Sequence, residues 1–236
     1  MFLFVLNPQN SGSTAFARLL LTSPFAMSIG RNAEGQRHRA VRDRMFGEDR
    51  WNAEATMPWE RIKRRWTEAW RAAHTATGAT VVVEKSPPNL VRAAAIADAF
   101  PNRRFIVWNR NPYAVAASCR KRYGRAVEES AAHWLVCAAA LLALRADVSP
   151  ILSLTYEQAC ANPAAAAEDV LAFAPELGAL DATAPLEIKD YPAAPLRDCN
   201  TEQIATLSRS EMDAITALLA PRRMLLEVFG YDLEAT

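Results

Sequence analysis

A short polar loop near the N-terminus has the composition of an anion-binding turn. Residues 7–12, Asn-Pro-Gln-Asn-Ser-Gly, follow the apolar run Phe2–Leu6 and precede a helical pattern that begins near Ser13. A glycine-containing loop between a buried strand and a helix turns backbone N–H groups outward, and the helix dipole adds positive potential. The hydroxyls of Ser11, Ser13 and Thr14 can donate to phosphate oxygens. The Walker pattern G-x-x-x-x-G-K-[ST] is absent, so a typical P-loop NTPase is not indicated.

A second pair of polar residues follows a later apolar run. Arg110 directly follows the predicted strand Arg104–Asn109, and Ser118 stands eight residues on, inside the next predicted helix. An arginine that binds in a bidentate manner, beside a hydroxyl, suits a terminal phosphate. Because ligands of parallel sheets bind at the carboxyl ends of strands, we expect this pair and the Ser11–Thr14 turn to face one edge. Two such groups indicate a nucleotide with phosphates at two positions, not a linear triphosphate.

Two adjacent charged residues, Glu84 and Lys85, lie at the end of another predicted strand, Thr80–Glu84. A carboxylate at the mouth of a cleft can accept the proton of an attacking hydroxyl, and Glu84 is the candidate base. The alternative is a salt bridge from Glu84 to a strand-end arginine or lysine. Lys85 is a candidate electrostatic clamp on the transferring group, and its alternative is a solvated surface lysine.

A parallel sheet is needed to bring these residues together. Four short apolar segments alternate with helical patterns, and the predicted strands are Phe2–Leu6, Thr80–Glu84, Arg104–Asn109 and Pro150–Thr155. This alternation is typical of an α/β fold with three layers, α/β/α, in which helices cover both faces of a central parallel sheet. The length suits a single domain over residues 1–236.

A long insertion without strand signals, about residues 31–77, separates the first two predicted strands, and we expect a helical cap there. Trp59, Trp66 and Trp70 share one helical face. Such a helix either packs its aromatic rings on the sheet or covers the active site and contacts the acceptor. The tryptophans suit a flat or apolar acceptor, whereas the local excess of basic residues suits an acidic one.

The overall composition excludes several classes of protein. The chain has 236 residues, 27 Lys plus Arg, 26 Asp plus Glu and a formal charge of +1, so neither disorder nor binding to nucleic acid is indicated. No apolar run approaches the roughly 18 residues needed to cross a membrane, and Phe2–Leu6 is too short for a signal peptide. We therefore expect a cytoplasmic protein. The four cysteines and three histidines lack metal-binding spacing, so no metal is expected, and the oligomeric state cannot be predicted.

Four motifs resemble, in order and spacing, those of the PAPS-dependent sulfotransferases (PAPS is 3′-phosphoadenosine 5′-phosphosulfate). They are P-x-x-S-G-S-T after the first predicted strand, E-K-S-P after the second, R-x-P-x(5)-S after the third and T-Y-E before a later helix. The resemblance covers roughly residues 2–24 and 80–163. It implies a P-loop-like phosphosulfate loop, PAPS as the donor, a small-molecule acceptor and no metal.

The resemblance also assigns roles to residues. The loop that would bind the 5′-phosphosulfate consists of Gln9, Asn10, Ser11, Gly12, Ser13 and Thr14. Arg110 and Ser118 would hold the 3′-phosphate. Glu84 falls where several branches of the family place their base, and Lys85 would reach the transferring group. Tyr156 would lie near the nucleotide; the alternative is a core residue at a strand end.

One position departs from the family pattern. The phosphosulfate loop usually carries Lys or Arg immediately before S-G, and Asn10 stands there. Loss of one preorganised group of this kind commonly costs on the order of 100-fold in rate. Either Lys85 or an arginine of the cap compensates, or the chain binds nucleotide with weak turnover.

We therefore expect a sulfotransferase that moves a sulfuryl group from PAPS to a hydroxyl or amine of a small molecule. One alternative is a protein that binds PAPS or its desulfated product PAP (3′-phosphoadenosine 5′-phosphate) with weak or no catalysis. Another is a small-molecule kinase of the P-loop type, against which the missing Walker lysine and the Arg110–Ser118 pair argue.

Overall fold

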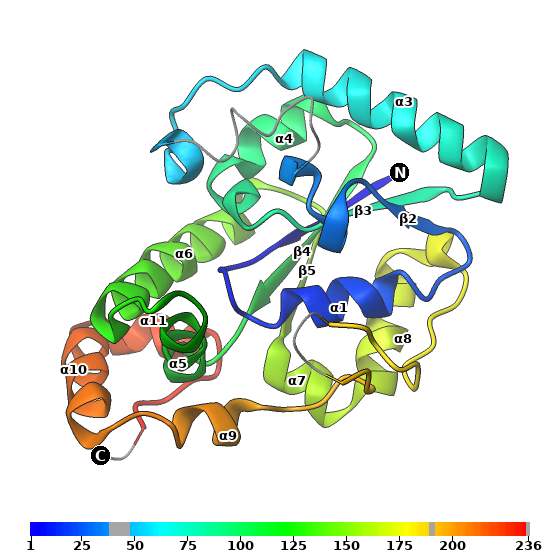
Figure 1. Cartoon of the computed structure of the whole chain (residues 1–236). Coiled ribbons are helices and arrows are strands. Elements are labelled where there is room, and N and C mark those ends of the chain that lie inside the picture. Colours follow the sequence, from blue (N-terminus) through cyan, green and yellow to red (C-terminus); the bar gives the residue numbers. More distant parts are fainter. Residues whose placement is uncertain (38–47, 189–191, 235–236) are drawn as a thin grey trace.

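A five-stranded sheet forms the centre of the computed structural model, which describes residues 1–37, 48–188 and 192–234 (Figure 1). The strands are β1 (Phe2–Leu6), β2 (Ala26–Ser28), β3 (Val81–Glu84), β4 (Arg103–Asn109) and β5 (Ile151–Thr155). Their order in space is β2-β3-β1-β4-β5, and every neighbouring pair is parallel. The predicted α/β fold is confirmed. The short, half-buried strand β2 was not predicted from the sequence.

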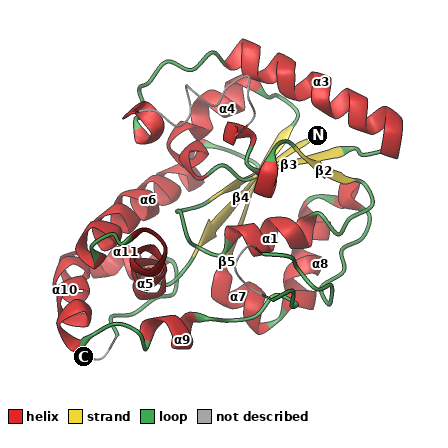
Figure 2. Cartoon of the chain, in the orientation of Figure 1, coloured by secondary structure: helices red, strands yellow, loops and turns green. Residues whose placement is uncertain are grey.

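Helices cover both faces of the sheet (Figure 2). They are α1 (Ser13–Leu20), α3 (Trp59–Thr77), α4 (Ala93–Ala99), α5 (Pro112–Tyr123), α6 (Val127–Asp147), α7 (Tyr156–Ala161), α8 (Pro163–Phe173), α9 (Asn200–Ile204), α10 (Arg209–Leu219) and α11 (Arg223–Val228). The helices α1, α7 and α8 pack on one face, and α3, α4, α5, α6, α10 and α11 contribute to the core on the other. The result is a three-layer arrangement.

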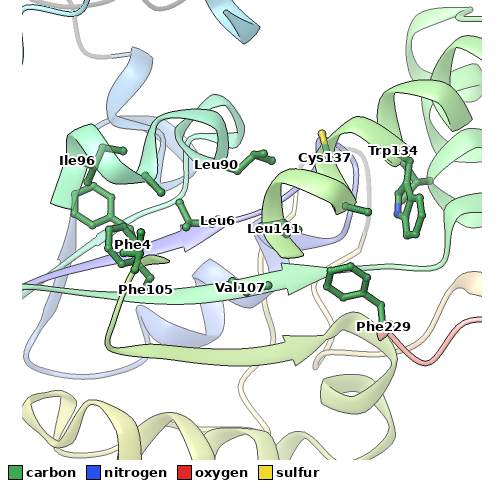
Figure 3. Packing of buried hydrophobic residues seen from close by; sticks show 14 of the residues in the cluster. Phe4, Leu6, Leu90, Ile96, Phe105, Val107, Trp134, Cys137, Leu141 and Phe229 are labelled. Carbon is green, nitrogen blue, oxygen red and sulfur yellow. The ribbon is translucent and has the colours of Figure 1, made fainter. Parts of the chain in front are cut away.

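The central strand β1 is buried on both faces. Phe4 and Leu6 point into the core that includes α4 and α6 (Figure 3), whereas Leu3 and Val5 pack with α1 on the opposite face. Alternate residues of a strand point to opposite faces, so a strand covered on both sides must be apolar throughout. Burial on both faces therefore explains why Phe2–Leu6 is apolar without interruption. The polar loop follows directly, at the carboxyl edge of the sheet.

The helix α3 packs on the sheet by its aromatic side chains. Trp66 is fully buried, and its ring centre lies 5.7 Å from that of Phe100 and 6.4 Å from that of Phe4. Of the two alternatives for this helix, the structure therefore shows packing on the sheet. Residues 38–47 of the predicted cap lie outside the described residues.

Among the described helices, α6 alone has a stretch, Val127–Leu144, long and apolar enough to cross a membrane by length and composition. The expectation that no such run exists is corrected on this point. Ala131, Trp134 and Leu141 on this helix are fully buried in the core (Figure 3). The Trp134 indole N–H donates to the carbonyl oxygen of Arg110 at 2.8 Å, so α6 also supports the end of β4.

Candidate active site

One cavity of about 320 Å³ at the carboxyl edge of the sheet brings most of the predicted site residues together. The predicted residues that line it are Gln9, Asn10, Gly12, Ser13, Thr14, Lys85, Arg110, Ser118 and Tyr156. They follow β1, β3, β4 and β5, whose carboxyl ends meet here. Both predicted phosphate-binding groups thus face the same space. Two predicted residues, Ser11 and Glu84, do not line it.

The turn after β1 requires glycine at position 12. Gly12 has φ 76°, in the left-handed region, and a Cβ there would lie 2.5 Å from a ring carbon of Tyr156. The Ser13 hydroxyl accepts a hydrogen bond from the Asn7 amide at 2.8 Å. The Ser11 hydroxyl is fully buried and donates to the Pro8 carbonyl oxygen at 2.7 Å. The prediction that this hydroxyl faces the ligand is therefore corrected: it closes the turn from inside.

Asn10 ties the tip of this loop to α5. Its backbone is left-handed, with φ 57°, and its side-chain amide donates to the Cys119 sulfur at 3.0 Å. Its backbone carbonyl oxygen accepts a hydrogen bond from Nη1 of Arg110 at 3.4 Å. The side-chain amide thus stands at the position at which a cation was expected, and the backbone of Asn10 links the loop to Arg110, the second phosphate-binding group.

Arg110 is a buried cation whose guanidinium is held on two sides. Its central carbon lies 4.1 Å from the centre of the Tyr156 ring, and its Nε donates to Oδ1 of Asn200 at 2.8 Å. The residue is 3% exposed, and its Nη2 has no hydrogen-bond partner among the described residues. An unpaired buried N–H on a charged group is unfavourable. This group at the cavity therefore fits an anionic ligand such as a phosphate.

The Tyr156 hydroxyl is fixed by a segment that also lines the cavity and includes Arg197 and Cys199. It donates to the Arg197 carbonyl oxygen at 2.7 Å and accepts from the Cys199 backbone N–H at 3.1 Å. Burial raises the pKa of Tyr156, so the hydroxyl keeps its proton. Its ring contacts two of the predicted site residues, because Gly12 packs against it and the Arg110 guanidinium stacks on it.

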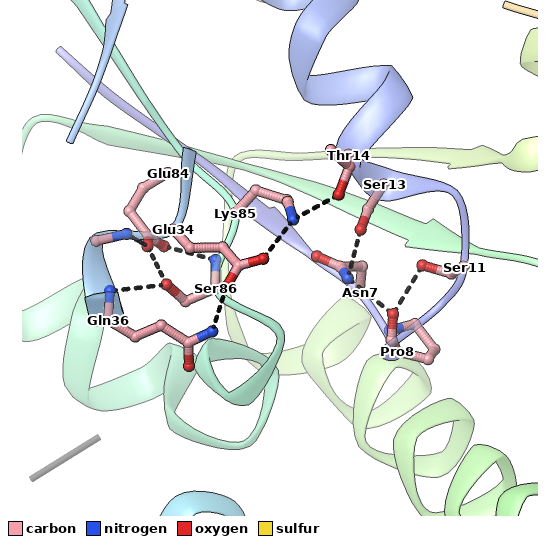
Figure 4. A network of polar contacts seen from close by, with 11 residues as sticks. Asn7, Pro8, Ser11, Ser13, Thr14, Glu34, Gln36, Glu84, Lys85 and Ser86 are labelled. Carbon is pink, nitrogen blue, oxygen red and sulfur yellow. Dashed lines mark hydrogen bonds and ion pairs between the residues drawn. The ribbon is translucent and has the colours of Figure 1, made fainter. Parts of the chain in front are cut away.

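Lys85 and Glu34 form a buried ion pair beside the loop (Figure 4). The Lys85 ammonium is 3.0 Å from Oε1 of Glu34 and 3.1 Å from the Thr14 hydroxyl. The Lys85 side chain is 2% exposed. Glu34 is the one carboxylate among the described residues that line the cavity. A cation and a candidate base are thus both adjacent to the phosphosulfate loop predicted from the sequence.

A family model described as the sulfotransferase family matches residues 3–176. The chain belongs to the sulfotransferase family. The sulfotransferase domain of the Synechococcus PCC 7002 olefin synthase has the same fold, with 17% identity, a TM-score of 0.57 and coverage of 99% of this chain and 95% of that domain. The sulfotransferase STF1 from Mycobacterium tuberculosis has 15% identity, a TM-score of 0.54 and coverage of 92% and 75%. No curated protein sequence matches the chain.

In this member of the family Glu84 is fully buried, so the expected position at the mouth of the cleft is wrong. Its carboxylate accepts the backbone N–H groups of Gly35 at 2.8 Å and Ser86 at 3.2 Å, together with the Ser86 hydroxyl and the Asn89 amide. Burial raises the pKa of Glu84 to about 7, although these hydrogen bonds act to lower it. The side chain thus joins the end of β3 to the segment that carries Glu34 (Figure 4).

The segment before Glu34 has a strained backbone. Asn32 and Ala33 have φ of 60° and 57°, which costs on the order of 1–3 kcal/mol at each non-glycine residue. The Lys85 N–H donates to the Ala33 carbonyl oxygen at 2.7 Å, and the Gln36 side-chain amide donates to Oε2 of Glu34 at 2.9 Å. These bonds hold the strained turn, and with it Glu34, in place at the cavity.

Sequence reasoning missed Glu34 and Asn200. Glu34 lies shortly after β2, at the same edge of the sheet as the other loops, so recognition of that short strand would have indicated it. Asn200 begins α9, far from every motif, and no local signal marks it. Within the described part of the chain, no group of three or more His, Cys, Asp or Glu side chains is arranged to hold a metal.

Proposed function

We propose that the chain is an enzyme that transfers the sulfuryl group of PAPS to a hydroxyl of a small-molecule acceptor. The observation that carries this proposal is the single cavity that joins the Gly12 turn to Arg110, whose buried Nη2 has no partner in the described structure. A donor with anionic groups at both ends of its adenosine fits two such anion-binding groups in one cavity. Bound PAPS would supply the sulfuryl group.

The predicted residues that line the cavity then have the following roles in binding the donor. Residues 9–14 and the N-terminus of α1 hold the 5′-phosphosulfate through N–H groups and the hydroxyls of Ser13 and Thr14. Arg110 and Ser118 hold the 3′-phosphate, as the family resemblance implies. Tyr156 orients the Arg110 guanidinium by stacking on it.

The chemical step needs a cation at the leaving oxygen and a base at the acceptor. Lys85 is next to Thr14 and stabilises the negative charge that develops on the leaving oxygen. Glu34 accepts the proton of the acceptor hydroxyl, because its carboxylate lines the cavity whereas that of Glu84 does not. Glu84 instead positions the segment that carries Glu34.

The proposal is tested with PAPS labelled in its sulfuryl group and a panel of phenols, alcohols, amines and sugars. Transfer of the label supports it. Binding of PAP without transfer to any acceptor favours a binding protein. That alternative arises because Asn10 stands where the family usually has Lys or Arg. Thermal stabilisation by ATP–Mg²⁺ and not by PAP would favour the kinase alternative.

Gly12→Ala should abolish measurable nucleotide affinity or weaken it at least tenfold, because the added Cβ lies 2.5 Å from the Tyr156 ring and must displace either the turn or the ring. The measurement is PAP titration calorimetry. Gly124→Ala is the matched control: Gly124 is also left-handed, at φ 63°, but a Cβ there meets nothing within 4 Å. The control should lose about 1–2 kcal/mol of stability and keep its affinity. Equal affinity in both variants would contradict the prediction.

Asn10→Lys should change the turnover number by less than about threefold, whereas Lys85→Met should lower it on the order of 100-fold. The reason is that the Lys85 ammonium already lies at the loop, 3.1 Å from the Thr14 hydroxyl. Steady-state rates with saturating PAPS measure both effects. A large gain in Asn10→Lys would show instead that the missing cation limits the wild-type rate.

A further inference from the structure

A partly buried chain of hydrogen bonds runs from Arg110 to Glu157, which does not line the cavity. Arg110 Nε donates to Oδ1 of Asn200 at 2.8 Å, and Nδ2 of Asn200 donates to Oε1 of Glu157 at 2.7 Å. Asn200 is 8% exposed, so neither bond competes freely with water. The described side-chain hydrogen bonds of Glu157 lead to the Arg110 guanidinium through Asn200.

Arg110 and Glu157 favour the same orientation of the Asn200 amide. A carboxylate accepts hydrogen bonds and cannot donate, so it requires the NH₂ end of the amide. The oxygen end faces Arg110, which can only donate. Without the Glu157 side chain, Asn200 loses one of the two side-chain hydrogen bonds that hold it beside Arg110. The carboxylate thus supports the position of the guanidinium through Asn200.

Two further elements hold Glu157 itself. The Asn111 backbone N–H donates to Oε1 of Glu157 at 2.9 Å, and the Tyr231 hydroxyl donates to Oε2 at 2.9 Å. Burial and the nearby Glu157 carboxylate raise the pKa of Tyr231, so its hydroxyl remains a donor. Asn200 and Tyr231 both lie beyond residues 3–176, the part that matches the family model. The C-terminal third of the chain thus completes the support of Arg110.

We infer that Glu157 is a positioning residue that sets the preference of this protein for 3′-phosphorylated nucleotides, acting through Asn200 on Arg110. This inference rests on the proposed function, because it takes Arg110 as the group that binds the 3′-phosphate. Asn200 and the Tyr156 ring fix the guanidinium so that Nη2 is left for the ligand. Loss of this support should affect ligands that carry a 3′-phosphate and spare those that lack it.

The test compares PAP with adenosine 5′-phosphate, which differ only in the 3′-phosphate, by calorimetry on the full chain. Glu157→Ala, which removes the acceptor of Asn200, should weaken PAP binding about tenfold and change the affinity for adenosine 5′-phosphate less than about twofold. Tyr231→Phe should weaken PAP binding by a smaller factor. Glu168→Ala, which removes an exposed carboxylate of α8, is the matched control and should change neither affinity. In an Arg110→Ala background, Glu157→Ala should have no further effect on PAP binding.

Equal losses for both nucleotides, or the same loss of PAP affinity in the Arg110→Ala background, would show a general structural role and overturn the inference. If thermal unfolding shows that Glu157→Ala does not fold, the same comparison is made with Asn200→Ala. A wild-type protein without any preference for PAP over adenosine 5′-phosphate would overturn the proposed function together with the inference. A wild-type preference that persists in Glu157→Ala and Asn200→Ala overturns the inference alone.

Discussion

Glu34→Gln should lower the turnover number at least about 100-fold while PAP affinity stays within about threefold of wild type. Glutamine keeps the size of the side chain and can still accept a hydrogen bond from Lys85, but it cannot take up a proton. Glu34 is the one carboxylate on the described lining of the cavity, and it is 3.0 Å from the Lys85 ammonium. Rates with saturating PAPS, together with PAP calorimetry, separate the chemical step from binding.

Glu84→Gln is the informative comparison for this prediction. The Glu84 carboxylate is surrounded by donors from Gly35, Ser86 and Asn89, so an amide NH₂ placed there opposes at least one of them. We expect a loss of about 1–3 kcal/mol in the free energy of unfolding. If Glu34→Gln retains the wild-type turnover number and Glu84→Gln lowers it tenfold or more at unchanged stability, Glu84 and not Glu34 is the base.

Arg110→Ala should weaken PAP binding on the order of 100-fold and leave the affinity for adenosine 5′-phosphate within about threefold of wild type. Arg110 as a residue is 3% exposed, so we expect its guanidinium to bind the 3′-phosphate with little competition from water. The buried Nη2 without a partner supplies the donor. Calorimetry with the two nucleotides measures the contribution of the 3′-phosphate directly.

Arg61→Ala removes the same charge from the exposed side of α3, away from the cavity lining, and controls for the change in net charge. It should leave both affinities unchanged. Equal losses for PAP and adenosine 5′-phosphate in Arg110→Ala would place Arg110 outside the 3′-phosphate site and remove one of the two anion-binding groups on which the proposed function depends.

The fold was predictable because its main strands are buried on both faces. A run such as Phe2–Leu6 has no polar interruption, and the loops after such strands necessarily meet at one edge. The sequence pattern alone therefore predicts that the Gly12 turn, Lys85 and Arg110 lie together. The three-residue strand β2 gave no such signal, because half-buried Ala, Met and Ser are equally typical of a loop.

The directions in which the side chains of the site point were less predictable than the fold. The pattern around Ser11 shows three hydroxyls, but only the backbone turn decides that this one donates inward to Pro8. The order Glu84–Lys85 places two charged side chains on opposite faces of the chain end, and the sequence does not say which one faces the ligand. Contacts between segments far apart in the chain, such as that of Asn200 with Arg110, leave no mark in local spacing.

The pairing of β1 with β3 bears on how such proteins diversify. Phe4 stands opposite Glu84 in this ladder, so the spacing between the loop after β1 and Lys85 is set by main-chain bonds and not by the long insertion that separates them in sequence. The insertion also carries Glu34, the ion-pair partner of Lys85, so a change at Glu34 would alter the surroundings of this cation. We expect changes elsewhere in the insertion to alter what approaches Glu34 while the loop after β1 and Lys85 keep their spacing.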